Sequence, residues 1–345
     1  MSDALLDVDN LSISFPMDEG MLDAVRSISF SIGRGRSLGL VGESGCGKSV
    51  TALSLLGLLP NSARISGESW VRIGEGAAVD LNTLDPSGKS IRQIRGRDIS
   101  MIFQEPMTSL SPLYTVGNQI IESILLHYSS DPFVARQRAI EMLDRVGIPN
   151  PDRRIDNYPF EMSGGMRQRV MIAMALSAHP SLLIADEPTT ALDVTIQAQV
   201  LDLMRDLQRE TSMSILFITH DLGVVAEMCD EVAVMYLGKI VERADVKTIF
   251  RKPRHPYTIG LLNSIPKLGQ ANAGKIVPID GTVPVPIGLP EACGFAQRCP
   301  FAMNGLCNSH EPPLTELDDG GSVACFLYPK VRNAVDSPSG ESTHE

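Results

Sequence analysis

Hydrophobic and polar residues alternate along the first 33 residues of the chain. Apolar side chains recur in two stretches, namely Leu6, Val8, Leu11, Ile13 and Phe15, then Val25, Ile28, Phe30 and Ile32. Alternation indicates half-buried strands, because successive side chains of a strand point to opposite faces. The pattern predicts two N-terminal strands, which we expect to form an antiparallel layer beside the main core.

Further along, short apolar runs alternate with stretches of helical spacing. The runs that predict buried strands are residues 37–41, 99–103, 182–185, 214–219 and 231–236. Helical spacing is found at residues 50–59 and at Ile196, Val200, Leu203 and Leu207. Strands that alternate with helices indicate an α/β fold class with a mostly parallel, covered core sheet.

Two segments interrupt this alternation. Residues from 105 onwards show helical spacing without strands, as at Val116, Ile120 and Ile124, and predict an inserted helical subdomain at about residues 105–178. Residues 67–98 are polar, and we expect them to be irregular. The domain boundaries that follow are a main domain of residues 1–264, a cysteine-rich extension of residues 265–329, and a disordered tail of residues 330–345.

Charge and composition limit the partners. The chain has 345 residues and a formal net charge of −11, so no basic face is available for DNA or RNA. The first residues, Met1-Ser2-Asp3-Ala4, show no basic leader region, and no apolar run reaches the roughly 18 residues of a membrane span. We expect a chain that is cytosolic or held at a membrane only through partners.

The strongest chemical signal is the segment Gly42-Glu43-Ser44-Gly45-Cys46-Gly47-Lys48-Ser49, which matches G-x-x-x-x-G-K-[ST]. Its glycines let backbone N–H groups wrap around a phosphate, its lysine supplies a positive charge, and its serine hydroxyl completes a Mg²⁺ shell. A glycine-rich turn with a surface lysine is the alternative, and the flanking strand and helix patterns disfavour it. The segment predicts a phosphate loop. Cys46 lies inside it, where the positive surroundings predict a reactive thiol of lowered pKa.

Two further segments suit a nucleotide site. Asp186 and Glu187 follow a predicted buried strand, where α/β sheets place their active sites, so Asp186 would orient Mg²⁺ and Glu187 would polarise a water molecule. A solvated turn is the alternative for this pair. Ser163-Gly164-Gly165 opens a predicted helix and forms a second anion site, although an ordinary helix cap has the same sequence. Since one nucleotide cannot easily use both glycine-rich sites, the nucleotide is expected to be shared between two subunits.

In their order along the chain, these motifs resemble those of the ATP-binding subunits of ABC transporters. The order is the phosphate loop, Gln104, the Ser163-Gly164-Gly165 signature, Asp186-Glu187, the Ala191-Leu192-Asp193 turn and His220. The resemblance covers residues 1 to about 250 and implies a P-loop ABC-type nucleotide-binding domain. Met162 stands where the signature usually begins with leucine, a substitution that conserves volume.

The resemblance implies roles in holding ATP and Mg²⁺. The phosphate loop, with Lys48, would bind the phosphates, and Ser49, Gln104 and Asp186 would hold the Mg²⁺. Glu187 would align and deprotonate the attacking water. Gln104 would also couple the γ-phosphate to the membrane subunits.

Three further roles are implied by the same resemblance. His220 would hold the γ-phosphate. The signature would contact the ATP of the opposite subunit, and Asp193 would lie across the dimer interface. Phe15 matches the aromatic residue that stacks on adenine, although a lone aromatic residue at a strand end is as often part of the core.

A narrower resemblance comes from Arg254-His255-Pro256-Tyr257-Thr258-Ile259-Gly260-Leu261-Leu262 and from Ser264-Ile265-Pro266. These segments are similar to the extension of dipeptide and oligopeptide importer ATPases, a group that includes relatives for nickel, glutathione or sugar conjugates. The resemblance implies an ATPase on the cytoplasmic face of the bacterial inner membrane. Its partners would be two integral-membrane permeases, a second homologous ATPase (a heterodimer, or alternatively a homodimer) and, indirectly, an extracytoplasmic solute-binding protein.

Four of the six cysteines, Cys293, Cys299, Cys307 and Cys325, crowd into a proline-rich segment. A reducing compartment disfavours disulfides, the nearby prolines disfavour four ordinary buried thiols, and the spacing leaves zinc and an iron–sulfur cluster open. The surrounding sequence resembles the tail of peptide-importer ATPases that carry a [4Fe–4S] cluster, which favours that cluster over Zn²⁺, in a structural role.

Two other classes of function compete with the importer. A soluble ABC ATPase of DNA repair or translation usually has two nucleotide modules and a basic surface, whereas this chain has one module and an acidic balance. A redox or metal sensor would use the four cysteines as its primary site.

Overall fold

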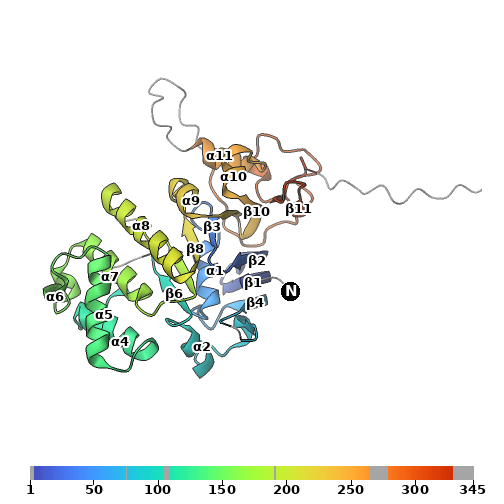
Figure 1. The fold of residues 1–345 in the computed structure, drawn as a ribbon. Helices are drawn as coiled ribbons and strands as arrows, with labels where there is room; N and C mark the ends of the chain where they lie inside the picture. Colours follow the sequence, from blue (N-terminus) through green and yellow to red (C-terminus); the bar gives the residue numbers. More distant parts are fainter. Residues whose placement is uncertain (1–3, 75, 105–108, 190–191, 265–278, 329–345) are drawn as a thin grey trace, which may run out of the picture.

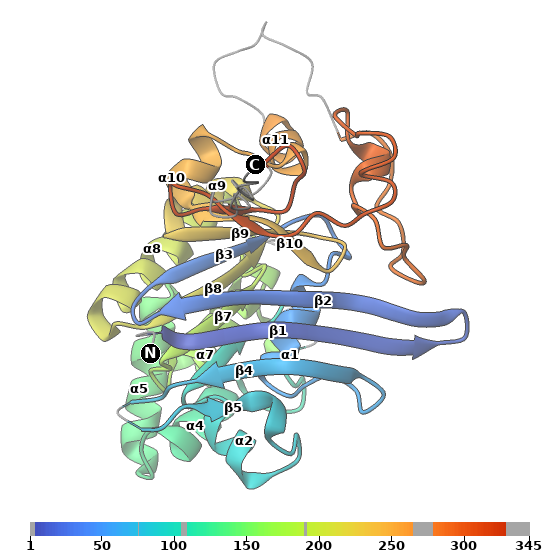
Figure 2. The ribbon, with the colours of Figure 1, turned by 90° about the vertical axis from the view of Figure 1, so that its right-hand side faces the viewer.

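The computed structural model describes residues 4–74, 76–104, 109–189, 192–264 and 279–328, which form two β-sheets and several layers of helices (Figure 1). The first sheet is antiparallel, in the order β2-β1-β4-β5. Its strands are β1 (Ala4–Met17), β2 (Gly20–Gly33), β4 (Arg64–Val71) and β5 (Val79–Asp80). The predicted pair of N-terminal strands and their antiparallel layer are confirmed, as Figure 2 shows most directly.

The second sheet forms the core, in the order β11-β12-β10-β9-β3-β8-β7-β6. Its strands are β3 (Ser37–Val41), β6 (Ile99–Ile102), β7 (Leu182–Asp186), β8 (Ser214–Thr219), β9 (Glu231–Tyr236), β10 (Lys239–Asp245), β11 (Thr315–Glu316) and β12 (Ser322–Val323). From β9 to β6 all pairings are parallel, whereas β10, β11 and β12 pair antiparallel. The predicted mostly parallel core sheet is confirmed.

Helices lie between and around these strands. They are α1 (Lys48–Leu55), α2 (Lys89–Ile94), α4 (Val116–His127), α5 (Pro132–Arg145), α6 (Pro151–Arg154), α7 (Gly164–Leu176), α8 (Val194–Thr211), α9 (Leu222–Met228), α10 (Val246–Arg251) and α11 (Pro256–Asn263). Short 3-10 turns cover Leu81–Thr83, Pro159–Glu161 and Ala296–Arg298. The predicted helical segment corresponds to α4 to α7, which group at one side of the core sheet in Figure 1. Among the described residues, no helix is long and apolar enough to cross a bilayer.

The prediction that residues 67–98 are irregular is wrong. This segment contains most of β4, together with β5 and α2. Strand β4 pairs with β1, but most of its side chains are exposed, so it lacks the apolar alternation by which sequence patterns reveal strands. Backbone hydrogen bonding to β1 defines it instead.

Alternate residues of the core strands serve two separate hydrophobic layers. Leu182 and Ile184 of β7 face the layer that β1, β2 and α1 share, whereas Leu183 and Ala185 face the layer that contains α4, α5 and α7. Because a strand sends successive side chains to opposite faces, one buried run builds both layers. The phosphate loop follows β3, which lies between β9 and β8 in this doubly covered sheet.

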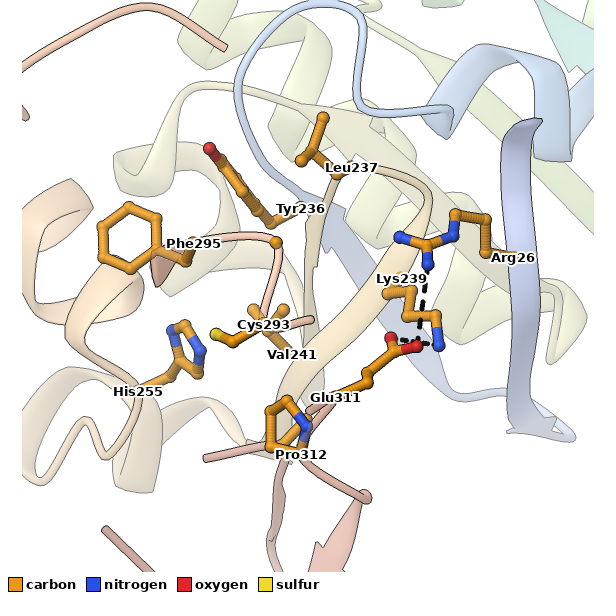
Figure 3. A pocket seen from close by; sticks show the side chains of 12 residues that line it. Arg26, Tyr236, Leu237, Lys239, Val241, His255, Cys293, Phe295, Glu311 and Pro312 are labelled. Carbon is orange, nitrogen blue, oxygen red and sulfur yellow. Dashed lines mark ion pairs between the residues drawn. The ribbon is translucent and has the colours of Figure 1, made fainter. Parts of the chain in front are cut away.

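The part of the cysteine-rich extension that the structure describes, residues 279–328, packs directly against the main domain; we call it the C-terminal region. Ala324 N–H donates to Val241 O at 2.8 Å, and β12 pairs with β10. Glu311 forms ion pairs with Arg26 of β2, at 3.6 Å, and with Lys239 of β10 (Figure 3). The two short strands therefore extend the core sheet. The expected tail of residues 330–345 lies outside the described residues, and the domain boundaries remain predictions.

Candidate nucleotide-binding site

The parallel strands bring the predicted catalytic residues to one edge of the core sheet. The phosphate loop follows β3, Gln104 follows β6, Glu187 follows β7, and His220 follows β8. Since these strands run parallel, their carboxyl ends lie at the same edge, where open α/β sheets bind ligands. The order of the strands thus brings residues that are far apart in sequence close together in space.

The phosphate loop has the backbone that its glycines predict. Gly42, Gly45 and Gly47 have φ angles of 155°, 81° and 100°. A Cβ atom at Gly42 would lie 2.1 Å from Met235 O, and one at Gly47 would lie 2.2 Å from Ala24 O. The loop therefore needs glycine both for its dihedral angles and for its close approach to neighbouring backbone.

Lys48 is buried and closes the loop on itself. Its Nζ atom donates to Gly42 O at 2.8 Å and to Glu43 O at 2.9 Å. These carbonyls hold the ammonium group at the loop, and its role in binding a phosphate remains a prediction. The loop conformation is preorganised by contacts within the chain.

The prediction of a reactive Cys46 is wrong. The side chain is fully buried, and burial raises the pKa of its thiol, although Lys48 Nζ at 3.6 Å from Sγ acts in the opposite direction. Desolvation of a thiolate outweighs the nearby positive charge. Cys46 can therefore contribute its backbone to the phosphate loop, but its thiol is not presented to a ligand.

Asp186 has the surroundings of a magnesium-coordinating carboxylate. It is 3 % exposed, and its Oδ1 atom has no hydrogen-bond partner within the described part of the chain. Burial raises its pKa; the hydrogen bond with Ser49 lowers it, and the charge of Glu187 raises it further. A buried carboxylate oxygen without a partner, beside a serine hydroxyl, fits a hard cation such as Mg²⁺. The roles of Ser49, Gln104 and Asp186 as Mg²⁺ ligands remain predictions.

Glu187 lies at the centre of a polar cluster. Gln104 Nε2 donates to Glu187 Oε2 at 3.2 Å, and His220 Nδ1 lies 3.0 Å from Glu187 Oε1. The Glu187 backbone has a φ of 48°, and its N–H donates to Ile218 O at 2.8 Å, which ties this residue to β8. Gln104 and His220, which are predicted to act with Glu187 in catalysis, thus both contact its carboxylate.

The signature and the Asp193 turn lie at helix N-termini. Ser163 Oγ accepts from Met166 N at 3.3 Å at the start of α7, while Gly164 is exposed with open space around it. Asp193 caps α8 by accepting from Ile196 N at 3.0 Å. Both N-termini are capped, and the exposed backbone at Gly164 is accessible to an anion. Ala191 of the same turn lies outside the described residues.

Phe15 is half-buried at the end of β1 and packs against the hydrophobic layer beneath the first sheet. This position suits either of the two interpretations that the sequence allowed, adenine stacking or core packing. Stacking of Phe15 on adenine remains a prediction.

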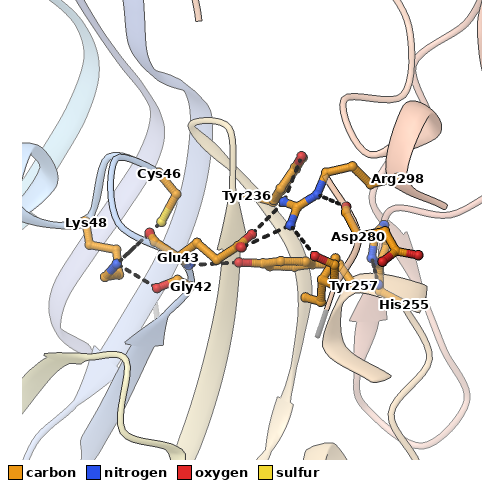
Figure 4. A network of polar contacts seen from close by, with 10 residues as sticks. Gly42, Glu43, Cys46, Lys48, Tyr236, His255, Tyr257, Asp280 and Arg298 are labelled. Atoms are coloured by element: carbon orange, nitrogen blue, oxygen red, sulfur yellow. Dashed lines mark hydrogen bonds and ion pairs between the residues drawn. The ribbon is translucent and has the colours of Figure 1, made fainter. Parts of the chain in front are cut away.

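Sequence reasoning missed two residues that contact the phosphate loop. Tyr257 Oη accepts from Glu43 N at 2.8 Å, and Arg298 forms an ion pair with the Glu43 carboxylate at 2.7 Å (Figure 4). Tyr257 and Arg298 are 214 and 255 residues away from Glu43, so no local pattern indicated these contacts. The motif allows any residue at the position of Glu43, so it did not draw attention to this side chain.

The four clustered cysteines line one cavity, together with His255, Phe295 and Phe301. Burial raises the pKa of Cys293 to about 11 and that of Cys299 and Cys325 in the same direction. Burial also lowers the pKa of His255 to about 4, so its imidazole is neutral. Within the ranges that the structure describes, however, no three His, Cys, Asp or Glu side chains are grouped closely enough to hold a metal ion.

The fold and site define a P-loop ATPase with a core sheet, an antiparallel layer and a helical layer. The model of the ABC transporter family matches residues 25–190, and the model of the oligopeptide/dipeptide transporter C-terminal region matches residues 241–307. Two curated relatives are the dipeptide transport ATP-binding proteins DppD of Bacillus subtilis, 50 % identical over 94 % of each chain, and of Escherichia coli, 46 % identical over 94 % of this chain and 97 % of that one. A dimeric ATP-binding cassette solved with ADP and Pi has a TM-score of 0.62 and 25 % identity, over 70 % of this chain and 98 % of that one.

The chain belongs to the family of ATP-binding proteins of peptide ABC transporters, and it is an ATPase subunit of such a transporter. The resemblance that the motifs indicated is confirmed.

Proposed function

We propose that the chain drives uptake of dipeptides or oligopeptides by hydrolysing ATP, as one of two ATPase subunits bound to two membrane permeases. It acts peripherally, on the cytoplasmic face of the inner membrane, and an extracytoplasmic protein supplies the solute. The observation that carries the ATPase part is the contact of Glu187 with Gln104 and His220 beside the phosphate loop. The names of the relatives and the match to residues 241–307 support the peptide cargo. Nickel, glutathione or sugar conjugates are the alternative cargoes.

The proposed mechanism is in-line transfer of the γ-phosphoryl group to water. The N–H groups of the phosphate loop and Lys48 hold the phosphates, and His220 and Gln104 complete the surroundings of the γ-phosphate. Glu187 accepts a proton from the attacking water. Ser49, Gln104 and Asp186 would hold Mg²⁺, which would supply neutralising charge for the phosphates. Catalysis therefore depends on positioning and charge stabilisation.

Dimerisation is the remaining part of this mechanism. We propose that Ser163, Gly164 and Gly165 approach the nucleotide of the opposite subunit, while Asp193 lies at the subunit interface. ATP binding closes the dimer, and hydrolysis reopens it. The exposed N-terminus of α7 and the dimeric state of the solved relative support this arrangement.

The test is co-expression of the chain with two candidate permeases and a candidate second ATPase of a peptide importer. We expect the membrane proteins to co-purify and the ATPase rate of the reconstituted complex to rise when a peptide-loaded binding protein is added. Lys48→Ala is the control, because loss of the phosphate-binding charge should remove the activity. Stimulation by DNA or RNA in place of the peptide would favour the rival soluble ATPase, and stimulation by nickel or glutathione would change the cargo.

We further propose that Cys293, Cys299, Cys307 and Cys325 hold a [4Fe–4S] cluster. Their common cavity and its phenylalanine side chains support the proposal. A single Zn²⁺, with Zn–S bonds of about 2.3 Å, would require the thiolates to lie within about 4 Å of one another. A cubane separates its four thiolates further, because four irons and four sulfides lie between them. Among the described residues, no three His, Cys, Asp or Glu side chains are close enough to hold a metal ion, so the proposal rests on the shared cavity and on the sequence resemblance.

Anaerobic purification tests the cluster. We expect a brown protein with about four irons per chain. Cys299→Ser should lower the iron content, whereas Cys229→Ala, which removes a buried cysteine outside the cavity, should not. A colourless protein with one zinc per chain, or a metal-free protein of unchanged stability, would contradict the proposal.

A further inference from the structure

Glu43 of the phosphate loop is held from two sides by Tyr257 of α11 and Arg298 of the C-terminal region. Its backbone N–H donates to Tyr257 Oη at 2.8 Å. Its carboxylate accepts two hydrogen bonds from the Arg298 guanidinium, Nη1 to Oε2 at 2.7 Å and Nη2 to Oε1 at 3.1 Å (Figure 4). Such paired, charge-assisted bonds fix orientation as well as distance.

The ion pair differs from an ordinary surface pair because Arg298 is almost completely enclosed. The Arg298 side chain is 5 % exposed, whereas that of Glu43 is 30 % exposed. Arg298 Nε also donates to Asp280 O at 2.9 Å, and the guanidinium lies 5.8 Å from the centre of the Tyr236 ring. Arg298 is thus also held by Asp280 of the C-terminal region and packs on Tyr236 of β9, so its position does not depend on Glu43 alone.

Tyr257 is equally well fixed. It is fully buried in α11, and its ring packs against Tyr236 and Phe295, with centroid distances of 4.7 Å and 5.4 Å. The start of α11 is held by the buried Glu242 carboxylate of β10, which accepts from the backbone N–H of Arg254 and of His255 at 2.7 Å and 2.9 Å. A buried network therefore connects the core sheet to the phenol that contacts the loop.

These contacts fix the backbone of the phosphate loop at Glu43. Glu43 O accepts from Lys48 Nζ at 2.9 Å, while Glu43 N donates to Tyr257. The two polar backbone atoms of Glu43 are thus fixed by the phosphate-binding lysine on one side and by α11 on the other. The direction of the following N–H groups, which meet the phosphates, depends on this geometry.

We infer that Arg298 and Tyr257 are positioning residues of the ATP site, through which the C-terminal region and α11 set the conformation of the phosphate loop and hence its affinity for ATP. The inference rests on the ATP site proposed above. It does not depend on which solute is transported or on which metal the cysteines bind. A variant that loses the contacts of Arg298 and Tyr257 with Glu43 keeps its catalytic residues, but its phosphate loop is less ordered and therefore binds ATP more weakly.

The test compares ATP affinity with thermal stability in the full-length chain. Arg298→Ala and Glu43→Gln each break the ion pair, and Glu43→Gln does so without any change in the C-terminal region. Tyr257→Phe removes only the hydroxyl that accepts the hydrogen bond from the Glu43 N–H. We expect the Kd and KM for Mg-ATP to rise about tenfold in Arg298→Ala and Glu43→Gln, the size expected when a charged hydrogen-bonded pair is lost. We expect kcat in the assembled complex to change less than twofold, and the double variant to bind ATP no more weakly than either single variant.

Glu311→Gln is the matched control. It weakens another contact between the C-terminal region and the core, the pairs with Arg26 and Lys239, without touching the phosphate loop. We expect it to lower the Tm about as much as Arg298→Ala but to leave ATP affinity unchanged. ATP affinity within twofold of the parent in both Glu43→Gln and Tyr257→Phe would overturn the inference, as would additive effects in the double variant. Failure of the parent chain to bind ATP would instead reject the proposed nucleotide site itself.

Discussion

Glu187→Gln is expected to lower ATP turnover by about two to four orders of magnitude while ATP binding is retained, since this is the usual contribution of a general base. Glutamine keeps the shape of the side chain and can still hydrogen-bond to Gln104 and His220, but it cannot accept a proton from water. The position of Glu187 between these two residues, at 3.2 Å and 3.0 Å, is the physical reason for the prediction. Steady-state turnover and nucleotide affinity of the reconstituted complex measure the two effects separately.

A surface carboxylate provides the control for this experiment. Glu227 is paired with Arg205 away from the site, so Glu227→Gln changes the net charge by the same amount and should leave turnover unchanged. Turnover of Glu187→Gln within tenfold of the parent would remove Glu187 from its assigned role. Loss of ATP binding would show that the carboxylate organises the site and does not act as its base.

Gly47→Ala is expected to destabilise the fold by about 3–5 kcal/mol, because a left-handed backbone and an atomic overlap act together. Gly47 has a φ of 100°, and a Cβ atom there would lie 2.2 Å from Ala24 O, a backbone atom of β2. Neither side can move easily, since Gly47 is the N-cap of α1 and is buried between the two sheets. Urea denaturation without nucleotide isolates the folding effect from any effect on binding.

Gly45→Ala separates the two causes. Gly45 also has a positive φ, of 81°, but no atom lies within 4 Å of the position that its Cβ would take. We expect this variant to be destabilised only by the strain of the left-handed backbone, by about 1–2 kcal/mol. Equal denaturation midpoints for Gly45→Ala and Gly47→Ala would contradict the claim that close packing against β2 requires glycine at residue 47.

The sequence predicted Glu187 from a local pattern, an apolar run that ends in two carboxylates, whereas Gln104 and His220 were implied by the resemblance to ABC transporter ATPases. The apolar runs before Gly42, Gln104, Glu187 and His220 are buried parallel strands, and the rule that ligands bind at their carboxyl ends needs no further structural information. Contacts such as Gln104 with Glu187, 83 residues apart, follow from the strand order, which the sequence left open.

Other features depended on neighbours that sequence patterns do not reveal. Strand β4 is exposed on most of its length, so only its pairing with β1 identifies it. Cys46 is in a positively charged loop, as predicted, but packing removes its side chain from water, and desolvation then dominates its pKa.

By itself, the sequence determined that this chain has an α/β core, and it predicted a phosphate loop and a catalytic carboxylate, because glycine geometry, buried strands and charge are properties of short segments. Only the tertiary structure decided that Tyr257 and Arg298 contact Glu43, because such contacts depend on how distant segments pack. The phosphate loop closes on Lys48 through local bonds, but its outer side is completed by residues more than 200 positions away. Long-range packing, which short-range periodicity does not encode, therefore sets the final geometry of a site whose chemistry is local.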